Sequence, residues 1–283
     1  MIRARLLGTV LALGVVVSGS APARAGTPVR AAKETGLTAY AIMERMNAAF
    51  YYAGRDMKAR VRLELVDRTH RELLRVMMLL RRNETEGRDQ KYLIYFQEPG
   101  DVRRTSCMVW KYAGKEDDRW IYVRAVDRVR HIIAPEQTSF VGSDFTREDL
   151  AGRNYGADSD SLVGEDRVKG RPCYVVRSLP LDNPGYARRL TWVDQENFLP
   201  LRIEYLDAKS VTIRIFTADS VEVIKSRVIR GREYPTVTRR TMTDLRSGHR
   251  TEMTYEEVAF DLGLTDGDFS ERRMRQEPAL WVP

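Results

Sequence analysis

The chain has 283 residues, with 47 Lys and Arg against 40 Asp and Glu, and two cysteines. The charges of both signs are interspersed, which argues against a nucleic-acid partner because such a partner needs a clustered basic face. The length is ample for a buried core and suits one large β domain or two ordinary domains.

The first 25 residues have the pattern of a cleavable secretory signal. Two arginines precede an apolar run over residues 6–17, and the segment closes on Ala23-Arg24-Ala25, a pattern that signal peptidase cuts. The run is shorter than the roughly 20 residues of a membrane span. No cysteine lies near the cut, so a lipid anchor is not indicated. We therefore predict a periplasmic protein with a net charge of 44 − 40 = +4 after cleavage, in which residues 26–36 form a flexible leader.

The segment from Leu37 to Tyr52 is typical of one amphipathic helix. Thr38 is a suitable N-cap, and apolar residues recur at helical spacing up to Phe50. A second, short helix is expected to run to Leu150 with Ser143 or Asp144 as its cap. A final short helix is expected from residue 268.

Most of the remaining chain alternates with period two or is rich in β-branched and aromatic residues between turn signals. Strands joined by short turns must be antiparallel. The sequence therefore predicts a mainly β protein with a single strongly curved antiparallel sheet. The expected strands lie at 58–65, 72–82, 88–99, 102–112, 119–123, 128–133, 161–170, 171–180, 187–194, 198–207, 211–224, 233–244 and 250–260.

A long sheet with so few helices to cover it is expected to leave an apolar hollow on its concave face. Such a hollow suits a greasy ligand, and methionine adapts well to flexible chains. Ordinary sheet core is the alternative for each residue taken singly. The candidate lining residues are Ile42, Met46, Phe50, Leu63, Val76, Met78, Ile94, Phe96, Met108, Trp110, Trp120, Tyr122, Leu201 and Ile203.

No constellation of residues indicates catalysis. His70, His131 and His249 are isolated, and neither a nucleophile elbow nor a phosphate-binding glycine loop is present. We expect no enzyme activity, no metal and no cofactor. Cys107 and Cys173 permit a disulfide in an oxidising compartment, or they are two small buried apolar residues.

The run from Tyr95 to Leu150 resembles the outer-membrane lipoprotein-sorting family with a LolA-like domain, and weaker likeness extends over residues 37–269. The most specific string is Phe140-Val141-Gly142-Ser143-Asp144-Phe145 followed by Glu148-Asp149-Leu150, in which Phe140, Gly142, Asp144 and Phe145 form a structural motif. We expect the Asp144 carboxylate to bind backbone N–H groups at a helix start, in preference to direct ligand contact. Two departures concern turn geometry: Arg104 stands where the family often has Gly, and Arg124 where it often has Pro.

The resemblance implies a half-barrel domain over residues 37–283 whose concave face holds acyl chains. The leading hypothesis is a periplasmic carrier of lipid or lipoprotein acyl chains that makes transient membrane contact and assists an envelope lipid exporter. An adaptor that docks on an RND-type envelope transporter through a fully packed sheet is the alternative. An esterase-type enzyme ranks third, because nothing in the sequence indicates its nucleophile.

Overall fold

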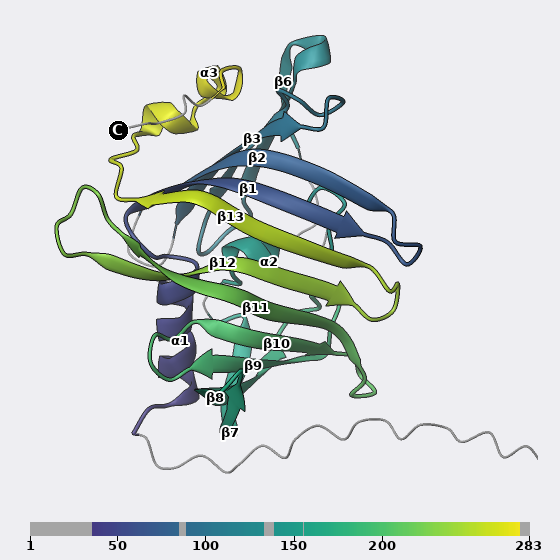
Figure 1. Ribbon diagram of the computed structural model, residues 1–283, viewed down its shortest axis with the longest axis vertical. Helices are drawn as coiled ribbons and strands as arrows, with labels where there is room; N and C mark the ends of the chain where they lie inside the picture. The colour runs from purple at the N-terminus through teal and green to yellow at the C-terminus, as the bar shows by residue number, and fades with distance from the viewer. Residues whose placement is uncertain (1–35, 85–88, 133–138, 155, 278–283) are drawn as a thin grey trace, which may run out of the picture.

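One sheet of thirteen strands dominates the computed structural model, which describes residues 36–84, 89–132, 139–154 and 156–277 (Figure 1). The predicted signal and nearly all of the predicted leader lie outside these residues. Neighbouring strands are antiparallel throughout, as predicted. In spatial order the strands are β6 (Arg128–His131), β5 (Asp118–Val123), β4 (Ser106–Lys111), β3 (Gln90–Glu98), β2 (Glu72–Asn83), β1 (Asp56–Val66), β13 (Arg250–Phe260), β12 (Glu233–Asp244), β11 (Thr212–Lys225), β10 (Pro200–Leu206), β9 (Arg188–Asp194), β8 (Arg171–Pro180) and β7 (Asp158–Val168).

The strands follow the predicted segments closely, with one instructive difference at β4. This strand begins four residues later than expected, since residues before it form a turn in which Arg104 has a φ of +68°. That region of backbone space favours glycine, so the arginine at this position costs some backbone strain. A 3₁₀ turn, η1 (Arg124–Val126), joins β5 to β6.

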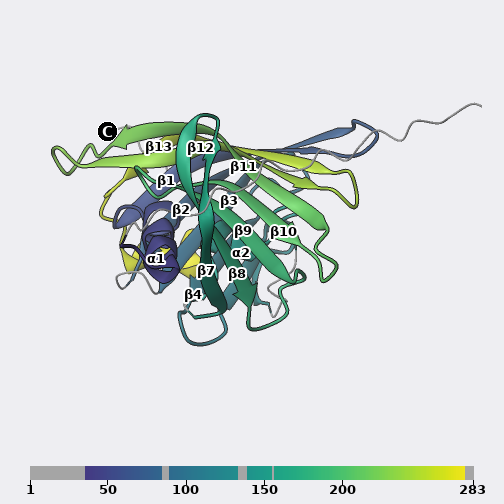
Figure 2. The same ribbon diagram turned by 90° about the horizontal axis from the view of Figure 1, so that it is seen from below.

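The sheet curls around two helices, which lie inside the trough that its strands form (Figure 2). Helix α1 (Ala39–Phe50) begins after Thr38, whose side chain accepts a hydrogen bond from the Ala41 N–H at 3.1 Å, as predicted. It buries Ile42, Met43 and Met46 against β8 and β9. Helix α2 (Arg147–Ala151) lies deeper in the trough. Within the described part of the chain, no helix is long and apolar enough to cross a membrane.

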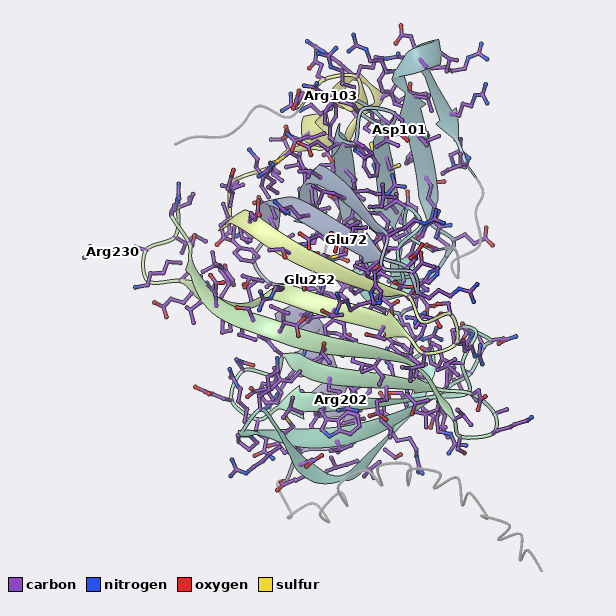
Figure 3. All side chains as sticks on the ribbon, turned by 45° about the vertical axis from the view of Figure 1, so that its right-hand side comes forward. Glu72, Asp101, Arg103, Arg202, Arg230 and Glu252 are labelled. Atoms are coloured by element: carbon purple, nitrogen blue, oxygen red, sulfur yellow. The ribbon has the colours of Figure 1, made fainter. Side chains whose placement is uncertain are left out.

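Alternation along the central strands separates an apolar concave face from a charged convex face. Ala59, Val61 and Leu63 on β1 are buried in the concave core, whereas the residues between them carry charge. On the convex face, Glu72, Glu252 and Arg202 lie on strands β2, β13 and β10 (Figure 3). This face needs no cover because its side chains are solvated.

At the β2–β6 end the convex face is apolar, and residues 266–274 cover it. Two short helical turns, η2 (Asp266–Phe269) and α3 (Glu271–Met274), form a C-terminal strap over this region. Phe269 and Met274 are almost fully buried there, and the Ser106 hydroxyl donates a hydrogen bond to the Met274 carbonyl at 2.8 Å. The residues that pack with the strap from the sheet include Leu80, Leu93, Met108, Trp110, Trp120 and Tyr122.

The structure corrects the predicted set of cavity residues. Six of the fourteen candidates point to the convex face, because their strand registers place them opposite to Leu63, Ile94 and Phe96. Their strands are apolar on both faces, and the sequence pattern alone does not distinguish the two sides. The six residues are Val76, Met78, Met108, Trp110, Trp120 and Tyr122.

Removing the aromatic anchor of the strap is expected to destabilise the protein substantially. Phe269→Ala should lower the free energy of unfolding by about 3–5 kcal/mol, as for other large-to-small changes in a packed core. Urea unfolding measures the change. Leu181→Ala, at a side chain that is 73% exposed, is the control and should alter stability by less than about 0.5 kcal/mol. Equal effects of the two substitutions would show that the convex cluster is not a core.

The two cysteines are free thiols, so the disulfide that the sequence permits is not formed. Cys107 lies on β4 and Cys173 on β8, and both pack in the main core. Burial raises the pKa of the Cys107 thiol to about 11 and that of the Cys173 thiol to about 12. The alternative of two small core residues therefore describes them.

Both thiols are expected to resist a thiol-specific reagent in the folded protein. Since the thiolate is the reactive form, Ellman's reagent at pH 7.5 should release little chromophore until denaturant is added, and two equivalents afterwards. Prompt reaction without denaturant would contradict the burial of the thiols, and no reaction in denaturant would indicate a disulfide.

Candidate functional site

The segment before α2 is a tight turn that places one aromatic ring in the core. The Phe140 N–H donates to the Phe145 carbonyl at 2.8 Å, and Gly142 adopts a φ of +82°, which few other residues tolerate. Phe145 is fully buried. The motif Phe140, Gly142, Asp144 and Phe145 thus builds the entry into α2.

The predicted helix cap is wrong. Thr146, not Ser143 or Asp144, is the N-cap of α2, and it forms a capping box with Asp149. The Asp144 carboxylate instead accepts a hydrogen bond from the Thr251 hydroxyl of β13 at 2.7 Å, and the Thr251 oxygen accepts from the Asp144 N–H at 3.0 Å. Ser143, Asp144 and Thr146 are all residue types that cap helices, and only the tertiary contact of Asp144 with β13 distinguishes them.

Asp149 is the most heavily bonded carboxylate of this region. One oxygen accepts from the Tyr205 hydroxyl of β10 at 2.6 Å. The other accepts from the Thr146 N–H at 2.7 Å, from the Thr146 hydroxyl at 2.9 Å and from the Arg214 guanidinium of β11. Asp149 is only 7% exposed. Helix α2 is therefore fixed to the β10–β11 side of the trough.

The other end of α2 is fixed to the opposite wall. The Lys111 ammonium of β4 donates to the Gly152 carbonyl at 3.1 Å and also to the Ala151 carbonyl. These are carbonyls that a helix leaves unsatisfied at its C-terminus. Because β4 and β10 are far apart in the order of the sheet, α2 spans the open trough from wall to wall.

Side chains from β2 and β3 hold the C-terminal end of α1. The Tyr51 carbonyl accepts from Arg81 at 2.6 Å and from Gln90 at 2.9 Å, and Arg81 donates also to the Ala53 carbonyl. Asn83 donates to the carbonyls of residues 52 and 54 at 3.0 and 2.7 Å. These polar contacts, here called the latch, hold the end of α1 on the sheet.

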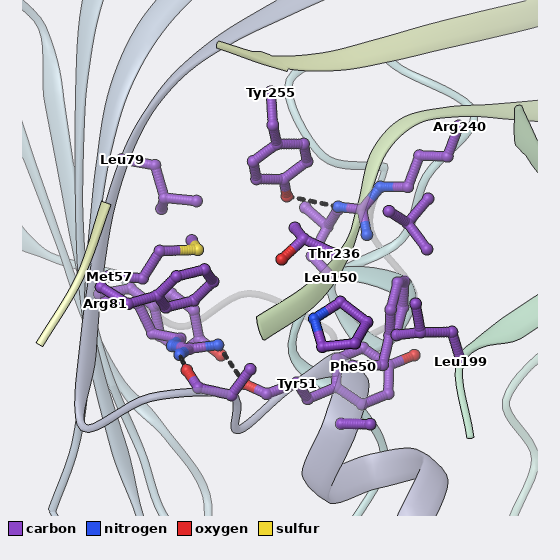
Figure 4. Close-up of a pocket in the computed structure, with 16 residues that line it drawn as sticks. Phe50, Tyr51, Met57, Leu79, Arg81, Leu150, Leu199, Thr236, Arg240 and Tyr255 are labelled. Atoms are coloured by element: carbon purple, nitrogen blue, oxygen red, sulfur yellow. Dashed lines mark hydrogen bonds between the residues drawn. The ribbon is translucent and has the colours of Figure 1, made fainter. Parts of the chain in front are cut away.

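A cavity of about 50 Å³ lies between this latch and β12 (Figure 4). Sites for drug-sized ligands are roughly 300–1,000 Å³, so this space holds a small polar group or a few waters and no acyl chain. Its lining is Ala49, Phe50, Tyr51, Ala53, Met57, Leu79, Arg81, Tyr92, Leu150, Leu199, Pro235, Thr236, Val237, Arg240, Tyr255 and Phe260.

Of the predicted cavity residues, the lining contains Phe50 alone. Ile42 and Met46 pack in the cluster between α1 and the β8–β9 region. The others on the concave side are packed in the main core: Leu63, Ile94, Phe96, Leu201 and Ile203.

Two arginines that the sequence analysis missed contribute charge to the cavity. Arg81 and Arg240 are each 4% exposed. The Arg81 guanidinium donates hydrogen bonds to the backbone carbonyls of the latch, and burial lowers its pKa from the ordinary value. Both arginines occupy inward positions of otherwise apolar strand faces, beside Leu79 and Met242 respectively, and this break in alternation is the signal that could have found them. In the described ranges, no three His, Cys, Asp or Glu residues lie together as a metal site would require.

The curled sheet and its covered trough define a LolA-like fold, and comparison with solved structures agrees. A DUF1329 family protein from Desulfovibrio piger is 26% identical over 83% of this chain and 97% of its own, with a TM-score of 0.71. A protein from Vibrio parahaemolyticus described as an outer membrane lipoprotein-sorting domain is 24% identical over 84% and 98%, with a TM-score of 0.72. A LolA superfamily protein from Nitrosomonas europaea is 20% identical over 84% and 99%, with a TM-score of 0.63.

A family model described as "-like: Uncharacterized protein" matches residues 88–276, which is more than half of the chain. The chain therefore belongs to this family, and its fold is LolA-like. No curated protein matches the sequence. The resemblance stated from the Phe140–Leu150 string is thereby confirmed.

The Asp149 network gives a graded prediction for stability. Asp149→Ala removes the helix cap and leaves the Arg214 guanidinium without its carboxylate, so unfolding free energy should fall by about 3–5 kcal/mol. Tyr205→Phe removes a single hydrogen bond and should cost about 0.5–1.5 kcal/mol. Urea unfolding of both variants tests the order. An Asp149→Ala variant as stable as Tyr205→Phe would mean that α2 does not depend on this carboxylate.

Proposed function

We propose that the protein is a periplasmic carrier that binds lipid or lipoprotein acyl chains on its concave face. The observation that carries the proposal is that a thirteen-stranded trough with an apolar concave face is closed by short helices alone. Only α1, with 12 residues, and α2, with 5, lie within it in the described part of the chain. An acyl chain would replace the contacts of a displaced helix with a gain of roughly 0.8 kcal/mol per buried CH₂.

Because the cavity is too small for an acyl chain, the trough would have to open by movement of a helix. Latch contacts at the end of α1 are hydrogen bonds to backbone carbonyls, which water can replace at modest net cost. In this proposal α1 moves while the wall-to-wall contacts of α2 persist. The carrier would load and release its cargo by contact with a membrane or an envelope transporter, and no chemical conversion is involved.

A second candidate is an adaptor that docks on an envelope transporter without carrying cargo. The closed cavity favours it, since about 50 Å³ leaves the trough nearly filled. The two candidates differ in one property, which is the binding of an acyl chain.

Filling the cavity from the sheet, which stays in place when α1 moves, distinguishes them. Leu79 of β2 lines the cavity, whereas Leu181 is 73% exposed. We expect the unmodified protein to bind a fluorescent fatty acid, dansyl-undecanoic acid, and Leu79→Trp to weaken this binding by at least about 10-fold, a change of roughly 1.4 kcal/mol. Fluorescence titration measures the dissociation constant.

Leu181→Trp is the matched control, because it makes the same change at an exposed leucine, and it should bind the probe as the unmodified protein does. Thermal unfolding of both variants verifies that the cavity-filling change has left the fold intact. If the unmodified protein fails to bind dansyl-undecanoic acid while it captures a transporter, the carrier proposal is wrong and the adaptor stands.

A further inference from the structure

Arg240 lies in an unusual environment for a cation. Its Nε and Nη2 atoms donate to the Met253 sulfur at 3.2 and 2.9 Å, and Nη2 donates also to the Tyr255 hydroxyl. Its guanidinium carbon lies 4.9 to 5.6 Å from three aromatic ring centres, those of Tyr255, Phe50 and Phe145. Nη1 has no hydrogen-bond partner within the described residues. Aromatic faces attract a cation, and a thioether is a weak hydrogen-bond acceptor, but neither group carries a negative charge that would neutralise the guanidinium.

No carboxylate compensates this charge. Within the described ranges, no Asp or Glu forms an ion pair with Arg240 or Arg81, and the sixteen residues that line the cavity include no acidic residue. The cavity therefore combines two buried guanidinium groups with apolar and tyrosine side chains (Figure 4). Burial of an unpaired charge is costly unless a partner group satisfies it.

Other buried arginines of the trough differ from this pair. Arg189 forms an ion pair with Asp158 at 3.0 Å, Arg214 with Asp149, and Arg153 with Glu148 at 2.7 Å. These three arginines have carboxylate partners, whereas neither arginine of the cavity has one among the described residues. An anion from outside the chain is the partner that this arrangement lacks.

We propose that the cavity is the head-group site of an anionic amphiphile, with Arg240 as the counter-ion of a carboxylate or phosphate oxyanion. The proposal rests on the carrier function and names its cargo class. Charge-assisted hydrogen bonds from a guanidinium fit both oxyanions. The volume of about 50 Å³ suits such a head group, and the acyl chain would take the space opened by α1.

Binding of matched probes to the unmodified protein tests the charge requirement without any substitution. Dansyl-undecanoic acid should bind about 10- to 100-fold more tightly than the corresponding dansyl-undecanol, as expected for hydrogen bonds to a charged group. Displacement of the acid probe by palmitate, hexadecyl phosphate and hexadecanol then separates the two head groups. Hexadecanol should be the weakest competitor, and the stronger of the two anions identifies the head group.

Three variants assign the preference to Arg240. Arg240→Gln should remove the preference for the acid over the alcohol, while Arg240→Lys should retain part of it. Arg239→Gln is the matched control, because Arg239 neighbours it on β12 and its side chain is 52% exposed. That control removes the same net charge and should bind both probes like the unmodified protein.

The outcomes separate this inference from the carrier function. Equal binding of acid and alcohol, or a preference that survives Arg240→Gln, overturns the head-group site and leaves a carrier of neutral chains. Binding of neither probe overturns the carrier function and the head-group site with it. Thermal unfolding gives an independent readout, because removal of an uncompensated buried charge should not lower the melting temperature of the ligand-free protein. A purely structural Arg240 would give a large loss of stability in Arg240→Gln and no probe preference in the unmodified protein.

Discussion

The carboxylate of Asp149 is the contact on which the arrangement of the trough depends. An open sheet of thirteen strands has no closing hydrogen bonds between its edge strands, so something else must hold its walls at a fixed separation. Asp149 ties α2 to β10 and β11, and Lys111 ties the other end of the helix to β4. With the walls fixed, the apolar concave face needs little further cover, and helix α1 supplies it.

The sequence predicted the sheet well because alternation and short turns act locally. Strand identity follows from period two, and antiparallel order follows from turns too short for a crossover. The Thr38 cap and the span of α1 were equally local. The cap of α2 was not, since Ser143, Asp144 and Thr146 are all good caps, and the hydrogen bond between Asp144 and Thr251 comes from a strand more than 100 residues away.

The candidate site was harder to predict, since it depends on which face of each strand points inward. Met108, Trp110 and Tyr122 were predicted as cavity residues, yet they pack with the C-terminal strap in a second core on the convex side, which no local pattern indicates. The informative residues were arginines in the apolar phase of a strand, Arg81 and Arg240. Whether such an arginine finds a carboxylate is a property of the tertiary structure, and it is this property that gives the cavity its proposed selectivity.

The central claim is that the trough opens to hold an acyl chain. Native mass spectrometry of the protein purified from the envelope of its own host, under conditions that preserve non-covalent complexes, tests it most directly. The account predicts a population whose added mass corresponds to an anionic lipid, released on denaturation and identified in the extract. Protein that remains free of lipid in this preparation, and after incubation with vesicles of anionic phospholipid, would contradict it.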